Sequence, residues 1–282
     1  MTPAIWTAIP EGDSLPEALR FLRGCGWECF ELSTEHLTEI ADDPQPARRV
    51  ETTRRILDEL GAIMPQAHAH LPANVAHPDA RRRSADIDLL LRHLECCADL
   101  GVRDVVIHAG AETYTTRDDL RRIAALNVDA FSRLADRAGE LGLRIGIENS
   151  LGGRGAHHRF GALVSELLDV VGTVGSPALG ITFDTSHANV GGLNLPAAIE
   201  ECGSHLFCTH ISDNNGSGDQ HLTPGSGTID WPAVMAALRG IRYDGLLNLE
   251  IPGENHPVRE LVGMKLRHAR AVADWLVGLA GV

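Results

Sequence analysis

Eight short apolar segments alternate with longer amphipathic segments along the whole chain, and this alternation constrains the fold more than any other feature. Between the apolar segments, residues recur at helical spacing, as they do from Ile87 to Ala98. Eight strand–helix pairs suit a chain of 282 residues, because a parallel eight-stranded barrel needs about 250 residues around one core. The predicted strands are Ala4–Ile9, Glu28–Leu32, Ala62–His70, Asp104–His108, Arg144–Glu148, Leu179–Asp184, Leu206–Ser212 and Gly245–Glu250.

Several of these segments, such as VVIHAG, IGIENS, GITFDTSH and LLNLEI, are apolar runs that end in a polar residue. This pattern is typical of parallel strands that are buried on both faces and open into a site at their carboxyl ends. An open, doubly wound sheet shows a similar alternation, but it usually has fewer strands and a Gly-rich first turn, whereas the first turn here reads IPEGDS. We therefore predict an α/β protein with one (β/α)8 TIM barrel domain over residues 1–282.

Glycines are expected to end the helices before several strands, at positions that need a positive φ. They are Gly61, Gly101, Gly142, Gly180 and Gly245. The six cysteines lack zinc-knuckle spacing and are expected to be reduced and mostly buried.

The charged residues exclude several function classes. The net charge of −13 argues against a surface that binds duplex DNA or RNA mainly through positive charge. Lys265 is the one lysine, so a Schiff-base or pyridoxal phosphate enzyme and a P-loop are not expected, and no motif predicts NAD or haem. The sequence has no apolar run of 18 residues and starts without a signal-peptide pattern, which favours a cytoplasmic protein with no membrane partner.

Imidazoles and carboxylates gather at the ends of the predicted strands from the third strand onward. In a barrel these ends meet at one mouth, and imidazole and carboxylate ligands together suit Mn²⁺, Zn²⁺, Co²⁺ or Fe²⁺. A single strand histidine is more often structural, but a buried lone carboxylate needs a partner or a metal ion. The residues are His68, His70, His108, Glu148, Asn149, Asp184, His187, His210, Asp219, His221 and Glu250.

With these residues the chain resembles the xylose-isomerase-like barrel superfamily. The ordered set IGIENS, FDTSHA, HISDN, DQHLTPGSGTIDW and LEI carries the resemblance. The similarity to its sugar isomerase and epimerase branch implies four metal ligands, Glu148, Asp184, His210 and Glu250. It also implies that Glu148 and Glu250 are the catalytic acid and base on opposite sides of a keto-sugar, with an enediolate between them.

The superfamily also contains apurinic endonucleases of the endonuclease IV type, which bind three zinc ions. Similarity to that branch implies nine ligands, all matched here, which adds His68, His108, His187, Asp219 and His221 to the four above. The segments after the first two strands, IPEGDSLP and ELSTEHLTEIADDP, are acidic and lack the aromatic side chains that such an enzyme inserts into DNA.

The isomerase or epimerase function is therefore the main expectation. A multinuclear zinc phosphoesterase and a metal-dependent sugar lyase or dehydratase are the alternatives. We expect one divalent ion, Mn²⁺ before Co²⁺, Zn²⁺, Fe²⁺ or Mg²⁺, and a small carbohydrate substrate, with nucleic acid disfavoured. The additional imidazoles and Asp219 would bind substrate or a further ion, His70 and Asn149 would bind substrate, and the chain would form a homo-oligomer by family habit.

The remaining histidines have no such placement and are expected at the surface or behind the site. Among them, His157 and His158 lie in a Gly-rich loop, LGGRGAHHRF, that could close over a substrate. The others are His36, His77, His93, His205, His256 and His268.

Overall fold

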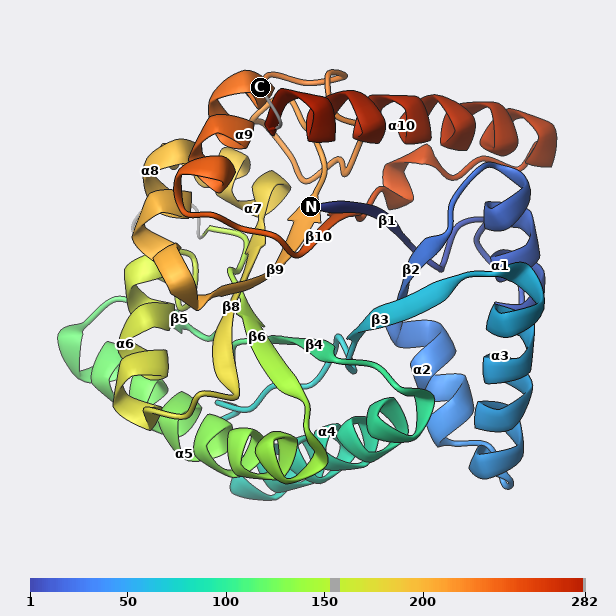
Figure 1. Ribbon diagram of the computed structural model, residues 1–282. Coiled ribbons are helices and arrows are strands. Elements are labelled where there is room, and N and C mark those ends of the chain that lie inside the picture. The colour runs from blue at the N-terminus through green and yellow to red at the C-terminus, as the bar shows by residue number, and fades with distance from the viewer. Residues whose placement is uncertain (153–157, 281–282) are drawn as a thin grey trace.

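Within the residues that the computed structural model describes, 1–152 and 158–280, eight parallel strands form a closed barrel. Figure 1 shows this ring of strands in the middle with the helices around it. The strands follow the order β1-β10-β9-β8-β6-β4-β3-β2 around the barrel, so the first and last barrel strands close it. Their bounds are β1 (Thr2–Trp6), β2 (Cys29–Leu32), β3 (Ile63–His68), β4 (Asp104–His108), β6 (Arg144–Glu148), β8 (Leu179–Asp184), β9 (Leu206–Ile211) and β10 (Leu246–Leu249).

The helices cover the outside of the barrel, as the predicted α/β alternation requires. The α-helices are α1 (Leu15–Gly24), α2 (Thr34–Ala41), α3 (Pro46–Leu60), α4 (Ala80–Leu100), α5 (Arg117–Leu141), α6 (Val164–Val174), α7 (Thr185–Val190), α8 (Leu195–Cys202), α9 (Trp231–Gly240) and α10 (Arg259–Ala280). Two short 3₁₀ helices are η1 (Gly203–His205) and η2 (Pro252–Glu254).

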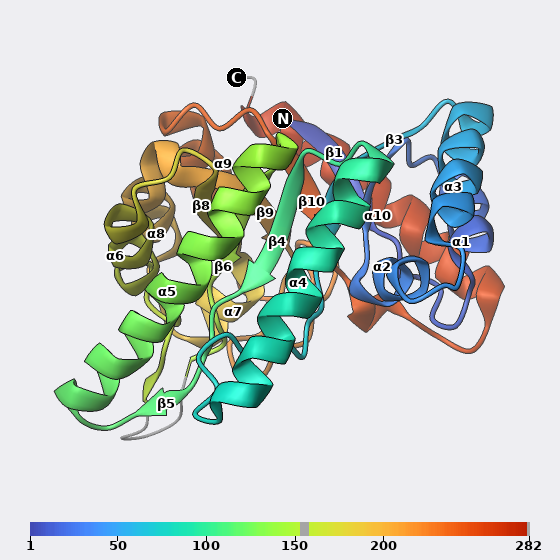
Figure 2. The same ribbon diagram turned by 90° about the horizontal axis from the view of Figure 1, so that it is seen from below.

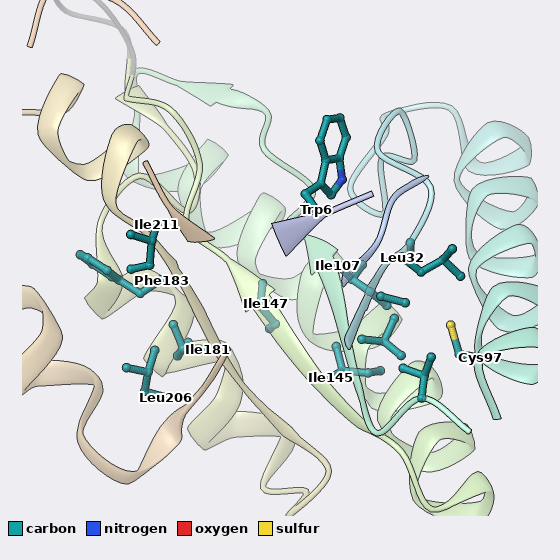
Figure 3. Close-up of a cluster of buried hydrophobic side chains, with 14 of the residues drawn as sticks. Trp6, Leu32, Cys97, Ile107, Ile145, Ile147, Ile181, Phe183, Leu206 and Ile211 are labelled. Carbon is teal, nitrogen blue, oxygen red and sulfur yellow. The ribbon is translucent and has the colours of Figure 1, made fainter. Parts of the chain in front are cut away.

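The main core lies between the strands and the helices. On β6, Ile145 and Ile147 are fully buried and point toward the helices, as Figure 3 shows together with Ile181 and Phe183 of β8. Because side chains alternate along a strand, the intervening residues of β6, including Glu148, face the barrel interior. The fold therefore separates an apolar outer layer from a polar interior at the mouth. The six cysteines are free and buried, as predicted.

Strand register aligns the polar residues at the mouth. His108 pairs with Glu148 across β4 and β6, and Asp184 pairs with His210 across β8 and β9. Neighbouring strands thus present their last polar residues at the same height, which local sequence spacing cannot specify.

Some strand ends differ from the prediction. The bounds of β4, β6 and β8 match it, but β3 ends at His68, two residues early, and β1 ends at Trp6 instead of Ile9. Beyond Thr7 the chain turns into a loop that contains Pro10, whose nitrogen cannot donate to a strand ladder.

Three of the five predicted helix-ending glycines are correct: Gly61, Gly101 and Gly142 follow their helices in the left-handed conformation. Gly180 and Gly245 are different, because neither has a positive φ. A Cβ on Gly180, inside β8, would lie 2.5 Å from the carbonyl oxygen of His205, and one on Gly245 would lie 2.5 Å from the Tyr243 hydroxyl. These two positions need glycine for close packing.

A two-stranded antiparallel sheet, not predicted from the sequence, lies on the mouth side. It joins β5 (Thr113–Tyr114) to β7 (His158–Arg159), and Figure 2 shows β5 beyond the end of β4. The Tyr114 hydroxyl donates a 2.5 Å hydrogen bond to Glu166 of α6, which fixes the small sheet to the barrel. His158 is exposed there, and His157 lies outside the described residues.

Candidate metal centre

Four residues of different strands meet at the centre of the mouth. Glu148 and Asp184 are the last residues of β6 and β8, His210 lies in β9, and Glu250 directly follows β10. One ligand atom from each lies within 4.8 Å of the others, and all four residues are buried. Two glutamates, an aspartate and a histidine at this spacing are suited to one divalent transition-metal ion.

A second group lies on one side of this central group and shares Glu148 with it. The Nε2 atoms of His68 and His108 lie 3.3 Å and 2.9 Å from Glu148 Oε2, while the other Glu148 oxygen, Oε1, lies 3.0 Å from His210 Nδ1. Glu148 thus places one oxygen in each group and would help to hold an ion in either of them.

A third group consists of Asp184, His187 and His221. Asp219 lies between the two imidazoles: its Oδ2 is 3.4 Å from His187 Nε2, and its Oδ1 is 3.0 Å from His221 Nε2. Asp184 belongs both to this group and to the central one. The structure therefore brings all nine predicted ligand residues into one continuous cluster.

Backbone carbonyls orient three of the imidazoles. Since a carbonyl only accepts, the nitrogen that faces it must carry the proton, which leaves the other nitrogen free for a metal ion. The Nδ1 atoms of His68, His187 and His221 donate to the carbonyl oxygens of Ala69 (2.8 Å), Asn149 (2.9 Å) and Glu250 (3.0 Å).

The electrostatic environment separates the two glutamates. Burial alone would raise the pKa of Glu148, but the charges of His210 and His108 outweigh it and hold the pKa well below its usual range. The pKa of Glu250 is raised, above all by burial and also by the charge of Glu148, although His210 and His221 oppose the change. The imidazoles therefore favour the ionised form of Glu148 more than that of Glu250 in the metal-free protein.

The third group and Asp219, together called the outer group below, hold opposite charges close to each other. Burial opposes protonation of His187 and His221, yet the nearby carboxylates of Asp184 and Asp219 raise both pKa values to about 10. Burial also opposes ionisation of Asp219, but the two imidazoles lower the pKa of Asp219 far below its usual range. Without a metal ion, protons occupy the nitrogens that would bind it.

The cluster fits a metal ion by a further observation. Three buried ligand atoms make no well-directed hydrogen bond within residues 1–152 and 158–280: His68 Nε2 and Glu148 Oε2, which lie 3.3 Å from each other, and Asp184 Oδ2. Buried polar atoms are normally paired, because an unpaired one costs about 1–3 kcal/mol. Their convergence on shared positions is accounted for if they coordinate cations.

Comparison with known proteins identifies the family. The profile described as "Xylose isomerase-like TIM barrel" matches residues 19–276. The chain belongs to this family. The match includes every residue of the cluster, so the cluster lies within the family's own fold.

Relatives of this xylose isomerase-like barrel carry different names. A protein of Mycobacterium leprae named "Probable endonuclease 4" is 30% identical over 200 residues, which cover 67% of this chain and 74% of that protein. The inosose isomerase of Bacillus subtilis is 24% identical over 165 residues, 56% of this chain and 57% of that protein. An uncharacterised protein of Methanocaldococcus jannaschii is 30% identical over 194 residues, and the match covers 68% of this chain but only 64% of that protein.

The fold is also found in solved structures. A D-tagatose 3-epimerase-like protein superposes with a TM-score of 0.82 at 23% identity, covering 100% of this chain and 98% of the other. In the described part of this xylose isomerase-like barrel, no helix is long and apolar enough to cross a membrane.

The loop between β9 and α9 carries Asp219 and His221, and one buried carboxylate organises it. Asp213 accepts hydrogen bonds from the backbone nitrogens of Asn214 (2.9 Å) and Gly225 (2.8 Å) and from the indole of Trp231 (3.0 Å). The residues of the motif SDN…GTIDW thus stabilise the loop through these hydrogen bonds, in addition to contributing to the family resemblance. Ser186 of α7 donates to Asp219 Oδ1 at 2.7 Å and fixes the orientation of that ligand.

Two predicted substrate-binding residues are placed outside the ligand groups. His70 lies beyond the end of β3, and its ring faces that of buried His93, 6.0 Å away between centroids. The Asn149 amide is bonded to the backbone of Asp184 in both directions, at 2.7 Å and 3.0 Å, so it joins the ends of β6 and β8. Substrate binding by His70 and Asn149 remains a prediction.

Sequence reasoning missed Glu31, which is fully buried in β2 and contacts His210. The available signal was a charged residue within the short apolar segment CFEL. His36 and His93 were expected at the surface or behind the site, and the structure buries both. His36 is bonded to Thr7 and Ser33, which connects the loops after β1 and β2.

Proposed function

We propose that this chain is a divalent-metal-dependent sugar isomerase or epimerase. The observation that carries the proposal is the central group, in which Glu148 and Glu250 flank the position of one ion beside Asp184 and His210. The named activities of the Bacillus subtilis inosose isomerase and of the D-tagatose 3-epimerase-like protein are consistent with this reading.

A metal ion bound by these four residues would stabilise negative charge on neighbouring carbonyl and hydroxyl oxygens of a keto-sugar. The side chains would move the protons. One glutamate would remove the proton from the carbon next to the carbonyl, and the other would return a proton to the opposite face or to the neighbouring carbon. Glu148 and Glu250 would share these two roles, because both belong to the central group.

A cavity of about 390 Å³ beside the mouth favours an uncharged substrate. Among the described residues its lining contains four carboxylates, Glu11, Asp13, Glu35 and Glu39, of which Asp13 is paired with Arg259. This acidic wall would repel a sugar phosphate and the backbone of a nucleic acid, whereas hydroxyl groups could donate hydrogen bonds to it. We therefore propose a free keto-sugar or a related polyol ketone as the substrate class.

Solvent deuterium exchange tests the proposal. A panel of unphosphorylated ketoses is incubated with the Mn²⁺-loaded protein in deuterated water, and loss of the proton next to the carbonyl is followed by proton NMR. Wild type should exchange that proton, whereas Glu148→Gln and Glu250→Gln should each exchange it at least about 100-fold more slowly. Unimpaired exchange in Glu148→Gln would overturn the two-glutamate assignment.

The matched control is Asp104→Asn. Asp104 is also buried but lies at the first residue of β4, at the end of the barrel opposite the mouth, where it binds Arg103 and Arg144. Asp104→Asn makes the same carboxylate-to-amide change in the same barrel. This variant should therefore exchange the sugar proton at the wild-type rate.

The second candidate function is a multinuclear zinc phosphoesterase. The second and third ligand groups favour it. They supply His68, His108, His187, Asp219 and His221, which one ion in the central group would not use. The relative named "Probable endonuclease 4" supports the same alternative.

Metal content separates the two candidates. The protein is purified without added metal and analysed by elemental mass spectrometry. About one ion of Mn, Co or Fe per chain would favour the isomerase, and two to three ions of zinc would favour the phosphoesterase. His68→Ala and Asp219→Ala should then abolish cleavage of an abasic duplex in the second case, but only weaken sugar exchange in the first.

A further inference from the structure

His210 differs from the other oriented imidazoles of the cluster. A backbone carbonyl holds each of His68, His187 and His221 through Nδ1 and leaves Nε2 for a ligand position. The orientation of His210 is reversed: its Nδ1 lies 3.0 Å from Glu148 Oε1. Its Nε2 lies 3.0 Å from the Oε2 atom of Glu31.

We propose that Glu31 is a positioning residue for the metal centre. Glu31 accepts the Nε2–H of His210 and thereby leaves Nδ1, directed toward Glu148 and Glu250, as the nitrogen that would bind a metal ion. This inference rests on the metal centre proposed above and names a residue outside its ligand groups. A carboxylate in this role fixes the tautomer of a ligand imidazole and increases its basicity.

The surroundings of Glu31 support this role. The side chain is fully buried, and the Gln66 amide of β3 donates to the same Oε2 atom, so the carboxylate is held from a second strand. An unpaired buried carboxylate would be costly, and within the described residues the imidazole of His210 is the group of opposite charge that it contacts. Glu31 belongs to none of the ligand groups of the described residues, so it acts on a metal ion only through His210.

Position in the sheet explains how Glu31 reaches His210. Glu31 lies on β2 and His210 on β9, and in the barrel order β1 and β10 separate these two strands. The contact crosses the barrel interior and joins residues 179 positions apart. Orientation of the ligand therefore depends on closure of the barrel by β1 and β10.

Metal affinity is the first test. Zn²⁺ and Mn²⁺ binding to wild type, Glu31→Gln, Glu31→Asp and Asp104→Asn is measured by competition with a fluorescent chelator. Glu31→Gln should bind about 10- to 100-fold more weakly than wild type. Glu31→Asp keeps the charge but withdraws it by one methylene and should lie in between, and Asp104→Asn should keep wild-type affinity. Wild-type affinity in Glu31→Gln would overturn the proposal.

The orientation of the His210 ring is the second test and needs no metal ion. A crystal structure of the metal-free wild type should show His210 Nε2 directed at Glu31, and in Glu31→Ala the ring should lose this fixed orientation. An unchanged His210 ring in Glu31→Ala would contradict the proposal. If wild type binds no metal ion, the metal centre and the proposed function fail, while this readout still decides whether Glu31 orients His210.

Discussion

At the scale of single residues, the charges of the outer group predict that metal binding releases protons. His187 and His221 have pKa values raised to about 10, so both imidazoles are protonated at pH 7.5 in the metal-free protein. Because a metal ion needs the neutral nitrogen, its binding must release these protons, and the apparent affinity must rise with pH up to about 10.

Calorimetric titration with Zn²⁺ at pH 7.5, in two buffers of different ionisation enthalpy, measures this release. We expect the observed enthalpy to differ between the buffers by about one or two proton ionisations per ion at this group. Asp219→Asn removes a charge that raises both pKa values and should release fewer protons. Equal enthalpies in the two buffers for wild type would contradict the assignment.

At the scale of elements, two glycines have opposite roles. Gly180 lies in β8, where a Cβ would meet the His205 carbonyl oxygen at 2.5 Å and the Phe207 ring at 2.6 Å. Gly172 lies in α6 with open space around its Cβ position. We expect Gly180→Ala to lower the free energy of unfolding by about 1–3 kcal/mol and Gly172→Ala to raise it by about 0.5–1 kcal/mol.

Urea denaturation of both variants checks this pair, since each adds one methyl group to the same barrel. If Gly180→Ala raised the free energy of unfolding instead, β8 would have room to move away from His205 and Phe207 without destabilising the barrel. A destabilising Gly172→Ala would contradict the open surroundings of the helix position.

The loop between β9 and α9 depends on Asp213. Its carboxylate accepts hydrogen bonds from Asn214, Gly225 and Trp231, and Asp213→Asn would replace an acceptor oxygen by a donor nitrogen. We expect a loss of about 1–3 kcal/mol in the free energy of unfolding. Because the same loop carries Asp219 and His221, Zn²⁺ affinity should fall as well. A variant with lower stability but unchanged Zn²⁺ affinity would show that these ligands are held independently of Asp213.

Individual elements also show how far the sequence was informative. The ends of β4, β6 and β8 are correct, because an apolar run and a following polar residue mark where each strand leaves the core. The end of β3 is wrong because His68 and His70 continue the alternation, while the last ladder bond to β4 is the one from Ala69 N to Val106 O. Alternation records which face is buried, but it does not record where the backbone leaves the sheet.

At the scale of the whole molecule, the metal centre connects segments that are far apart in the chain. Its ligands come from β3, β4, β6, β8 and β9, from helix α7, and from the segments that follow β9 and β10. Removal of bound ions would leave buried carboxylates and imidazoles without their counter-charges. A chelator should therefore lower the melting temperature, and restored ions should recover it.

Differential scanning calorimetry of the purified, chelated and reloaded protein measures this effect. Free metal at 100 times its dissociation constant stabilises a one-site protein by about 2.7 kcal/mol, which should be visible as a shift of several degrees. Metal loss proven by elemental analysis without any change in melting temperature would contradict a centre that joins the strands.

The sequence by itself determined the order of the elements, because strand alternation and polar strand ends are local properties of neighbouring residues. The set of nine candidate ligands came from the resemblance of the sequence to the superfamily. Only the tertiary structure decided that Glu148 is shared by two ligand groups, that His70 faces His93, and that Glu31 contacts His210. These contacts depend on which strands become neighbours and on the height at which the barrel closes. The physical reason is that barrel closure brings together strands that are far apart in the chain. Residue spacing along one strand carries no information about the distance between side chains of two such strands.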